Sequence, residues 1–349
     1  MNRSATRQNS PVEFAGTDTL VSSGPDESIL FAGLRAGLNL PYECASGGCG
    51  ACRAQLVGGA VSTRWEQATG LTERDRRKGG RILLCQSVAH GACQVRVTIP
   101  ETAGRGSPSR EPLPVRLPAQ ILEREFLSVD TARFVVVTSE PLAYLPGQFV
   151  LFEFGDGVRR AYSMSQMAPA KPDRLELLIR AKPGGAASGW LFDQVVTGSV
   201  LTVEGPYGKA YAQSPAERPV VCLAGGTGLA PILAIAEQLT SESPGRRLDL
   251  YVGGRQAGDL VMTDRLLALR SRGARIVAVA EDDSADTHPE LGPVRRGLAL
   301  DHVDQEWPDL SGHDLYVAGP APMIDATLRL LVRTGRAAAD RVFFDRFIS

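Results

Sequence analysis

Residues 41–56 read PYECASGGCGACRAQL, and residues 81–87 read RILLCQS. Four cysteines in these stretches follow the spacing C-x4-C-x2-C, a long gap and then C; they are Cys44, Cys49, Cys52 and Cys85. This spacing is typical of a plant-type [2Fe–2S] site, in which each iron takes two thiolates and the fourth cysteine comes from a distant element. The sequence therefore predicts a [2Fe–2S] cluster as the metal centre, with zinc on the same thiols as the alternative.

Glycine occupies positions 47, 48 and 50 of the same loop. Because glycine has no side chain, backbone N–H groups could approach the sulfides of a cluster closely at these positions. The remaining cysteines, Cys93 and Cys222, fall outside the spacing, and we interpret both as small buried hydrophobic residues.

The chain has 349 residues, which is enough for two or three domains. Its charged content is 22% and its formal net charge is −1, so composition does not indicate binding to nucleic acid or to an anionic membrane. The sequence has no run of about 18 apolar residues that would predict a transmembrane helix. The first 14 residues lack the apolar core of a signal peptide. Without export, six cysteines favour metal binding over a disulfide framework.

Composition and periodicity divide the chain into five segments. Residues 1–12 are expected to be a disordered tail, and residues 13–100 a domain around the cysteine loop. Residues 101–114 are expected to be a linker, because the stretch is rich in proline, glycine, serine and charge. Two further domains should follow at 115–214 and 215–349.

Each domain has its own pattern of elements. The first should contain strands at 18–22, 54–57 and 94–99 and a helix at 26–36. The second should be an antiparallel barrel, with strands at 133–139, 148–154, 175–181 and 200–204 and a helix at 188–195. In the third, strands at 220–224, 248–252, 275–280 and 314–318 alternate with helices at 229–239, 263–271 and 322–334. This alternation predicts a parallel sheet with helices on both faces.

Three stretches of the second domain suggest a flavin site. The stretch RRAYSM contains Arg160, Ala161, Tyr162 and Ser163, which could supply a cation for a diphosphate, an aromatic ring against the isoalloxazine and a hydroxyl near its polar atoms. In KPGGAASGWL, Gly184 and Gly185 precede Ser188 and a short helix whose free N–H groups could face a pyrophosphate. EGPYG, at 204–208, closes the barrel segment. The alternative for RRAYSM is an ordinary turn at a strand end.

A nucleotide site is suggested by two strand ends of the third domain. In PVVCLAGGTGLAPILAI, a buried strand leads through Gly225, Gly226, Thr227 and Gly228 into a helix, where phosphates could bind. In YVAGPAPMIDA, Gly319 and Pro320 follow a late strand at the same sheet edge. The first turn departs from G-x-G-x-x-G, so tight packing of strand on helix is the alternative.

Charge favours NADH over NADPH. Glu281 and two aspartates follow the strand at 275–280, and carboxylates there would repel a 2′-phosphate. Arg255, after the strand at 248–252, could instead pair with a 2′-phosphate and so favours NADPH.

The order of these motifs resembles the NADH-dependent reductase components of bacterial multicomponent oxygenases, over residues 13–349. The resemblance rests on the cysteine loop, RWEQATGL around Trp65, RAYSM, GPYG, LAGGTGLAP and the C-terminal VFFDRF. Within this family, the chain resembles the reductases of toluene 4-monooxygenase and xylene monooxygenase.

The resemblance implies a β-grasp ferredoxin domain, a FAD-binding barrel and an NAD-binding domain, in a cytoplasmic enzyme. It implies that Arg160, Tyr162 and Ser163 contact FAD and that Gly225–Gly228 and Gly319–Pro320 contact NADH. Electrons would pass from NADH through FAD and the [2Fe–2S] cluster to an oxygenase or its Rieske ferredoxin, and no side chain is assigned as a catalytic acid or base.

Two departures and two alternatives accompany the resemblance. Many relatives carry cysteine where this chain has Ala318, so no thiol should take part in hydride transfer. The tail at 347–349 resembles ends that pack near the flavin, with an ordinary core strand as the alternative.

The acceptor could instead belong to a ring-hydroxylating dioxygenase, a cytochrome P450 or a deoxysugar enzyme. A redox sensor or carrier that no longer turns over is the other alternative.

Overall fold

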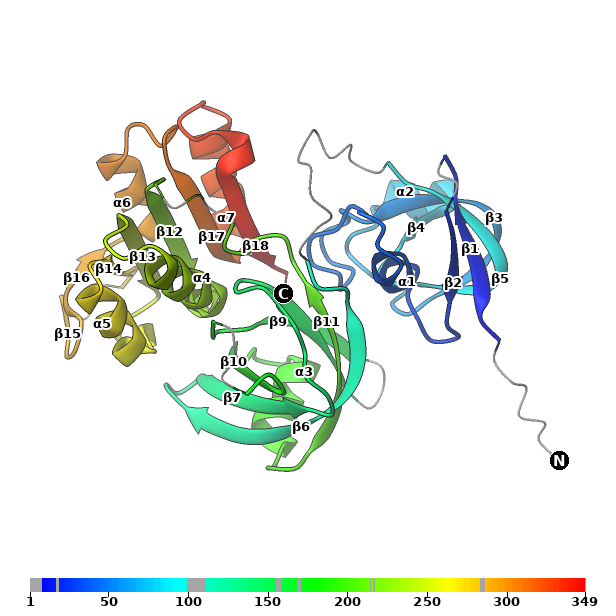
Figure 1. The fold of residues 1–349 in the computed structure, drawn as a ribbon, viewed down its shortest axis with the longest axis horizontal. Helices are drawn as coiled ribbons and strands as arrows, with labels where there is room; N and C mark the ends of the chain where they lie inside the picture. Colours follow the sequence, from blue (N-terminus) through cyan, green and yellow to red (C-terminus); the bar gives the residue numbers. More distant parts are fainter. Residues whose placement is uncertain are drawn as a thin grey trace. The chain divides into compact units, whose positions relative to one another are not determined.

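The computed structural model describes residues 8–16, 19–98, 111–154, 158–167, 171–213, 215, 217–282 and 286–348. The chain divides into two compact units, Met1–Val115 and Arg116–Ser349 (Figure 1). Most of the predicted linker, at residues 101–110, lies outside the described residues, as does the first part of the predicted tail, at 1–7. Among the described helices, none is long and apolar enough to cross a lipid bilayer.

The first unit contains a five-stranded sheet with the order β2-β1-β5-β3-β4 and two helices. Its elements are β1 (Ser10–Phe14), β2 (Leu20–Ser23), α1 (Ile29–Arg35), β3 (Arg53–Thr63), α2 (Glu73–Lys78), β4 (Arg81–Leu83) and β5 (Ser87–Arg96). Strands β1 and β5 run parallel, and the other pairings are antiparallel. Helix α1 begins after Ser28, whose hydroxyl accepts a hydrogen bond from the Phe31 N–H. The unit is therefore α+β, as expected.

The predicted tail was too long, because strand β1 begins at Ser10. Val12 is fully buried, and the Ser10 hydroxyl donates to the Ala89 carbonyl over 3.1 Å. The stretch SPVEF offers only two apolar residues, so its alternation was too short to predict a strand.

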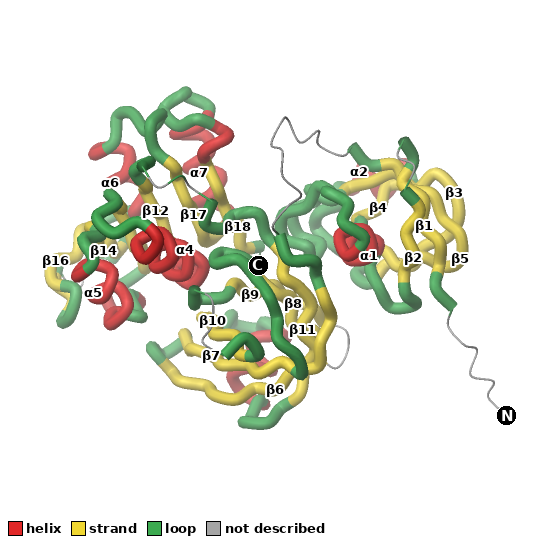
Figure 2. Tube along the Cα trace, viewed as in Figure 1, coloured by secondary structure: helices red, strands yellow, loops and turns green. Residues whose placement is uncertain are grey.

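The barrel part of the second unit is a six-stranded sheet with the order β10-β7-β6-β11-β8-β9 (Figure 2, in yellow). Its elements are β6 (Val115–Phe126), β7 (Thr131–Thr138), β8 (Phe149–Phe154), β9 (Val158–Ser163), β10 (Arg174–Arg180), α3 (Ala186–Gly189), the π-helix η1 (Trp190–Gln194) and β11 (Val200–Tyr207). An antiparallel bridge between Met164 and Leu177 joins the two ends of the sheet. The predicted antiparallel barrel is confirmed. The predicted helix at 188–195 begins earlier and becomes a π-helix, and neither β6 nor β9 was predicted as a strand.

The rest of the second unit is a seven-stranded sheet with the order β15-β16-β14-β13-β12-β17-β18. Its strands are β12 (Val220–Gly225), β13 (Leu248–Gly254), β14 (Arg275–Ala280), β15 (Thr287–His288), β16 (Gly292–Arg296), β17 (Asp314–Pro320) and β18 (Val342–Phe347). Its helices are η2 (Gly226–Gly228), α4 (Leu229–Glu242), η3 (Ala257–Asp259), α5 (Thr263–Ser271), α6 (Ala299–Glu306), α7 (Ala321–Thr327), η4 (Leu328–Val332) and η5 (Ala339–Arg341). The predicted helix at 322–334 is thus divided between α7 and the π-helix η4.

Strand β12 shows why this sheet has helices on both faces. Cys222 and Ala224 belong to the apolar layer that includes α4 and α5, whereas Val221 and Leu223 belong to the layer that includes α6 and α7 (Figure 1). Because neighbouring strand residues point to opposite faces, a continuous apolar strand needs cover on both sides. The predicted parallel sheet is confirmed; only β15 and β16 pair antiparallel among the strand pairs that the structure describes there.

Candidate functional site

The cysteine loop lies between α1 and β3, and Cys85 follows β4. The sulfur atoms of Cys52 and Cys85 are 3.3 Å apart, and a hydrogen bond joins the side chains of Cys44 and Cys49. The four thiols thus form two pairs, which fits a cluster whose two irons each take two thiolates. No three His, Cys, Asp or Glu side chains among the described residues surround one point that could hold a metal ion. The role of these cysteines as ligands therefore stays a prediction.

Within each pair, the shared hydrogen bond lowers the pKa of one thiol and raises that of its partner, and a neighbouring backbone approaches the loop closely. The hydrogen bond with Cys49 lowers the pKa of Cys44 to about 5, although burial acts in the opposite direction. Gly50 has a φ of +77°, and a Cβ atom there would lie 2.6 Å from the Gly70 carbonyl oxygen. Glycine is required at this position because a neighbouring loop passes so closely. Outside the loop, Cys93 and Cys222 are buried in the core, as predicted.

Two adjacent arginines of strand β9 lie in different environments. Arg159 is 5% exposed and points into the barrel, where it forms ion pairs with Glu204 and, at 3.3 Å, with Glu153. Arg160 is exposed, and its guanidinium donates to the Arg159 carbonyl over 2.8 Å. The alternation of the strand therefore leaves Arg160 at the surface, where a ligand's phosphate could reach it.

The other predicted flavin residues continue along β9. Ala161 is exposed, and Tyr162 is half-buried with its ring centroid 5.1 Å from that of Phe152. Ser163 is buried, and its hydroxyl donates to the Asp345 carboxylate over 2.7 Å. Asp345 lies on β18, so this bond joins the barrel strand to the C-terminal strand of the parallel sheet.

The predicted pyrophosphate segment lies at the start of α3. Gly184 has a φ of +69°, and Gly185 is the residue before the helix. The Ser188 hydroxyl accepts from the Lys182 N–H over 3.0 Å and lies 3.1 Å from the Lys182 carbonyl. Ser188 therefore holds the glycine turn in shape from within.

The predicted nucleotide residues come together at one edge of the parallel sheet. They are Gly225, Gly226, Thr227 and Gly228 after β12, and Gly319 and Pro320 at the end of the neighbouring strand β17. A Cβ atom on Gly228 would lie 2.0 Å from the Ala318 carbonyl oxygen, and one on Gly319 would lie 2.8 Å from the Gly225 carbonyl oxygen. Strands β13 and β17 flank β12, so this edge is the point where the strand order reverses, at which ligands of such sheets bind.

Glu281 is exposed after β14, two strands away from β12. Arg255, which argued for NADPH, is held by two carboxylates. Its guanidinium lies 2.8 Å from Asp130 of the barrel and 3.0 Å from Asp259. A 2′-phosphate would have to compete with both carboxylates for this cation.

Sequence reasoning did not identify Asp345 or Arg180. Arg180 ends β10, pairs with Asp130 and Asp259 at 3.3 Å each, and reaches within 3.5 Å of the position of a Cβ atom on Gly226. Arg180 belongs to no recognisable motif. For Asp345, the stretch VFFDRF was noted, but no local pattern indicates that its carboxylate meets Ser163.

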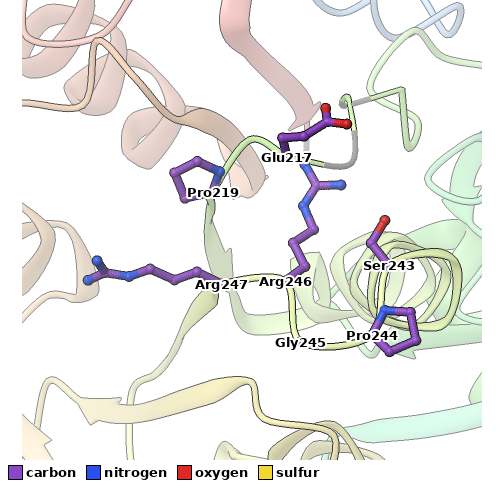
Figure 3. A pocket seen from close by; sticks show the side chains of 7 residues that line it. All are labelled: Glu217, Pro219, Ser243, Pro244, Gly245, Arg246 and Arg247. Atoms are coloured by element: carbon purple, nitrogen blue, oxygen red, sulfur yellow. The ribbon is translucent and has the colours of Figure 1, made fainter.

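A cavity of about 390 Å³ lies at the opposite edge of the sheet (Figure 3). It is lined by Glu217, Pro219, Ser243, Pro244, Gly245, Arg246 and Arg247. These residues precede β12 and β13, whereas the predicted nucleotide residues follow β12. The cavity is therefore separate from the candidate nucleotide site.

Three protein families match the chain. A 2Fe-2S iron-sulfur cluster binding domain matches residues 12–90, an oxidoreductase FAD-binding domain matches 118–211, and an oxidoreductase NAD-binding domain matches 222–329. The three matches correspond to the cysteine-loop unit, the barrel and the parallel sheet.

Whole-chain relatives have the same build. The chain is 41% identical to the ferredoxin–NAD(+) reductase component of the alkene monooxygenase system of Xanthobacter autotrophicus, over 93% of this chain and 96% of the relative. It is 32% identical to the xylene/toluene monooxygenase electron transfer component of Pseudomonas putida, over 92% and 89%. The solved ferredoxin reductase of carbazole 1,9a-dioxygenase is 30% identical, with a TM-score of 0.84 over 98% of this chain and 99% of that one.

The predicted family is thereby confirmed, together with its [2Fe–2S], FAD-binding and NAD-binding domains. The chain belongs to the ferredoxin–NAD reductase components of bacterial multicomponent oxygenase systems.

Proposed function

We propose that this chain takes electrons from NADH and supplies them to the oxygenase component of a hydrocarbon monooxygenase, through FAD and a [2Fe–2S] cluster held by Cys44, Cys49, Cys52 and Cys85. Bound FAD would supply the chemistry that converts a two-electron donor into a source of single electrons. The high identity to the alkene monooxygenase reductase supports this acceptor class. Because its proposed electron donor is NADH, we propose a cytoplasmic enzyme.

The observation that carries the proposal is the bond between Ser163 and Asp345 (2.7 Å). It brings the end of the proposed flavin strand to β18, which pairs with β17 beside Gly319 and Pro320. A flavin on β9 and a nicotinamide at the edge of β12 and β17 would therefore meet, as direct hydride transfer requires.

Each proposed flavin contact follows from the environment of its residue. Arg160 would neutralise a diphosphate charge from the surface. Tyr162 would pack its ring against the isoalloxazine, and the Ser163 hydroxyl, oriented by Asp345, would lie near the polar edge of the ring. The backbone at Ala161, Gly184 and Gly185 would approach the cofactor where a larger side chain would intrude.

The proposed nucleotide contacts lie at the sheet edge. The backbone of Gly225–Gly228 would face the phosphates, and Gly319–Pro320 would bound the nicotinamide. Glu281 would lie near the adenosine ribose, where its charge disfavours a 2′-phosphate. Because Asp130 and Asp259 already hold Arg255, we infer a preference for NADH.

Reconstitution with an oxygenase tests the acceptor. The chain should support NADH-dependent oxidation of an alkene or toluene when it is mixed with a di-iron hydroxylase encoded beside its gene. Turnover that occurs only with a Rieske ferredoxin and a ring-hydroxylating dioxygenase would replace the monooxygenase assignment. Failure to oxidise NADH with ferricyanide would instead favour a sensor or carrier.

A further inference from the structure

Helix α2 of the first unit is densely cationic. Its sequence is ERDRRK, and Arg81 follows after two glycines. The helix buries none of its residues. The cations Arg74, Arg76, Arg77, Lys78 and Arg81 face two carboxylates, Glu73 and Asp75, so the stretch carries five positive and two negative charges, a net charge of +3.

The helix is fastened to the loop that covers the cysteine loop. The Arg76 guanidinium donates to the carbonyl oxygens of Glu66 and Ala68. Two residues further on, the Gly70 N–H donates to the Gly47 carbonyl over 2.9 Å, inside the cysteine loop. The Thr69 hydroxyl donates to the neighbouring Gly48 carbonyl over 3.2 Å. The cationic helix is therefore held against a loop, and that loop is hydrogen-bonded to the cysteine loop.

Helix stability accounts for Arg76, Arg77 and Lys78, which lie in the last turn and complement the helix dipole, but not for Arg74. Asp75 is engaged with Thr72 in a capping box, and Glu73 pairs with Arg77 at 3.2 Å. Arg74 lies in the first turn, where a positive charge opposes the helix dipole and a carboxylate would be favoured. A cation that costs stability at an exposed position suggests a role in recognition.

An exposed tryptophan completes the surface. Trp65 is 38% exposed, and it lies in the same covering loop, with its carbonyl accepting from the Ala68 N–H over 3.2 Å. Tryptophan and arginine are both enriched at the centres of protein interfaces. We call the surface of Trp65, Arg74, Arg77, Lys78 and Arg81 the basic face.

We propose that the basic face docks the electron-accepting protein, and that this partner carries carboxylates around its own redox centre. The inference rests on the proposed function, because it assumes that electrons leave through the cluster beside this face. Each docking event moves one electron to the acceptor. One NADH, oxidised to NAD⁺ and a proton, therefore reduces two acceptor molecules.

Two small haem proteins of opposite charge test the docking surface in the full-length holoprotein. Cytochrome b5 has carboxylates around its haem edge, and cytochrome c has lysines. At low ionic strength, Arg74→Glu should slow the NADH-driven reduction of cytochrome b5 about threefold and speed that of cytochrome c, because steering by charge changes sign for the two probes. The triple variant R74E/R77E/K78E should change both rates about tenfold, and both effects should shrink in about 0.5 M salt.

Arg35→Glu is the matched control. Arg35 lies on α1 and pairs with Glu27 at 3.0 Å, so the variant changes the net charge as Arg74→Glu does but outside the basic face. Rates that change equally in the control, change in the same direction for both probes, or do not change at all would overturn the docking surface. NADH-driven bleaching of the protein's own flavin and cluster is recorded in parallel. Absence of bleaching in the unsubstituted protein would contradict the proposed function instead.

Discussion

Cys85 and Cys93 are both buried in the first unit, but their neighbours differ. The Cys85 sulfur lies 3.3 Å from that of Cys52, whereas Cys93 lies on β5 and its pKa is raised by burial. We predict that Cys85→Ser lowers the iron content from two per chain to near zero and removes the visible absorption of the cluster, whereas Cys93→Ser retains both. Iron analysis and absorption spectra check this. Loss of iron in Cys93→Ser alone would show that the ligand set is wrong.

The bond between Ser163 and Asp345 is the second residue-scale test. A charge-assisted hydrogen bond to an ionised carboxylate contributes about 1.5–3 kcal/mol, so its loss should disturb the position of the flavin. We predict that Ser163→Ala and Asp345→Asn each slow flavin reduction at saturating NADH by about tenfold or more. Stopped-flow measurement of flavin bleaching checks the rates.

The double variant of Ser163 and Asp345 distinguishes coupling from separate roles. If the two side chains act through their shared bond, the double variant should be little slower than either single variant. Effects that multiply would contradict the coupling.

The cysteine spacing could be predicted from sequence because the three loop ligands are local. The bond to Asp345 could not, because its partners lie 182 residues apart.

The turn between β12 and α4 gives a prediction at the scale of elements. A methyl group on Gly228 would lie 2.0 Å from the backbone oxygen of Ala318, and that backbone cannot rotate away as a side chain could. Gly228→Ala should therefore separate β12 from β17, cost about 1–3 kcal/mol of stability and raise the KM for NADH several-fold. Gly312→Ala is the control, because nothing lies within 4 Å of its Cβ position. An unchanged KM in Gly228→Ala would argue against this edge as the nucleotide site.

Helix α6 is joined to the parallel sheet through Glu306, which gives a pH-dependent prediction. Burial raises the pKa of Glu306, but hydrogen bonds from Arg295, Tyr251 and Arg275 outweigh it and lower the pKa to about 2. A carboxyl whose pKa is lower in the folded state stabilises the fold above its ordinary pKa, near 4.5. This contribution is lost as the pH falls toward 2.

Glu306→Gln should accordingly be less stable than the unsubstituted protein at neutral pH. The difference in free energy of unfolding should stay constant above about pH 5 and shrink between pH 4.5 and 2. Urea unfolding at a series of pH values measures it. A difference that grows on acidification would contradict the ion-pair explanation.

Elements were predictable where their pattern was long. Helix α5 and strand β14 have the predicted bounds: the helix is followed by Arg272 and Gly273, and the strand by Glu281 and Asp282. Strand β1 was missed because it is short. Strand β9 was noticed only as the motif RRAYSM, because arginines occupy both a buried and an exposed position and no apolar alternation marks the strand. The π-helices η1 and η4 interrupt predicted α-helices, and periodicity does not distinguish the two forms at this length.

At the scale of the molecule, ion pairs connect the barrel to the parallel sheet within the second unit. Arg265 of α5 lies 2.9 Å from Glu176 of the barrel and 2.7 Å from Glu237 of α4. Its side chain is 17% exposed, so these pairs are only partly screened by solvent. They help to keep the proposed flavin strand and nucleotide edge at a fixed separation. The order of motifs along the chain predicted three domains. The ion pairs between residues so distant in sequence could be identified only from the structure.

Anaerobic titration of the purified protein with NADH and then NADPH tests the central claim most directly. Our account predicts that low NADH bleaches the flavin and removes the cluster bands, and that NADPH does so only at much higher concentration. Equal response to both nucleotides would contradict the role given to Glu281, Asp130 and Asp259. Cluster absorption without flavin bleaching by either nucleotide would contradict the reductase function itself.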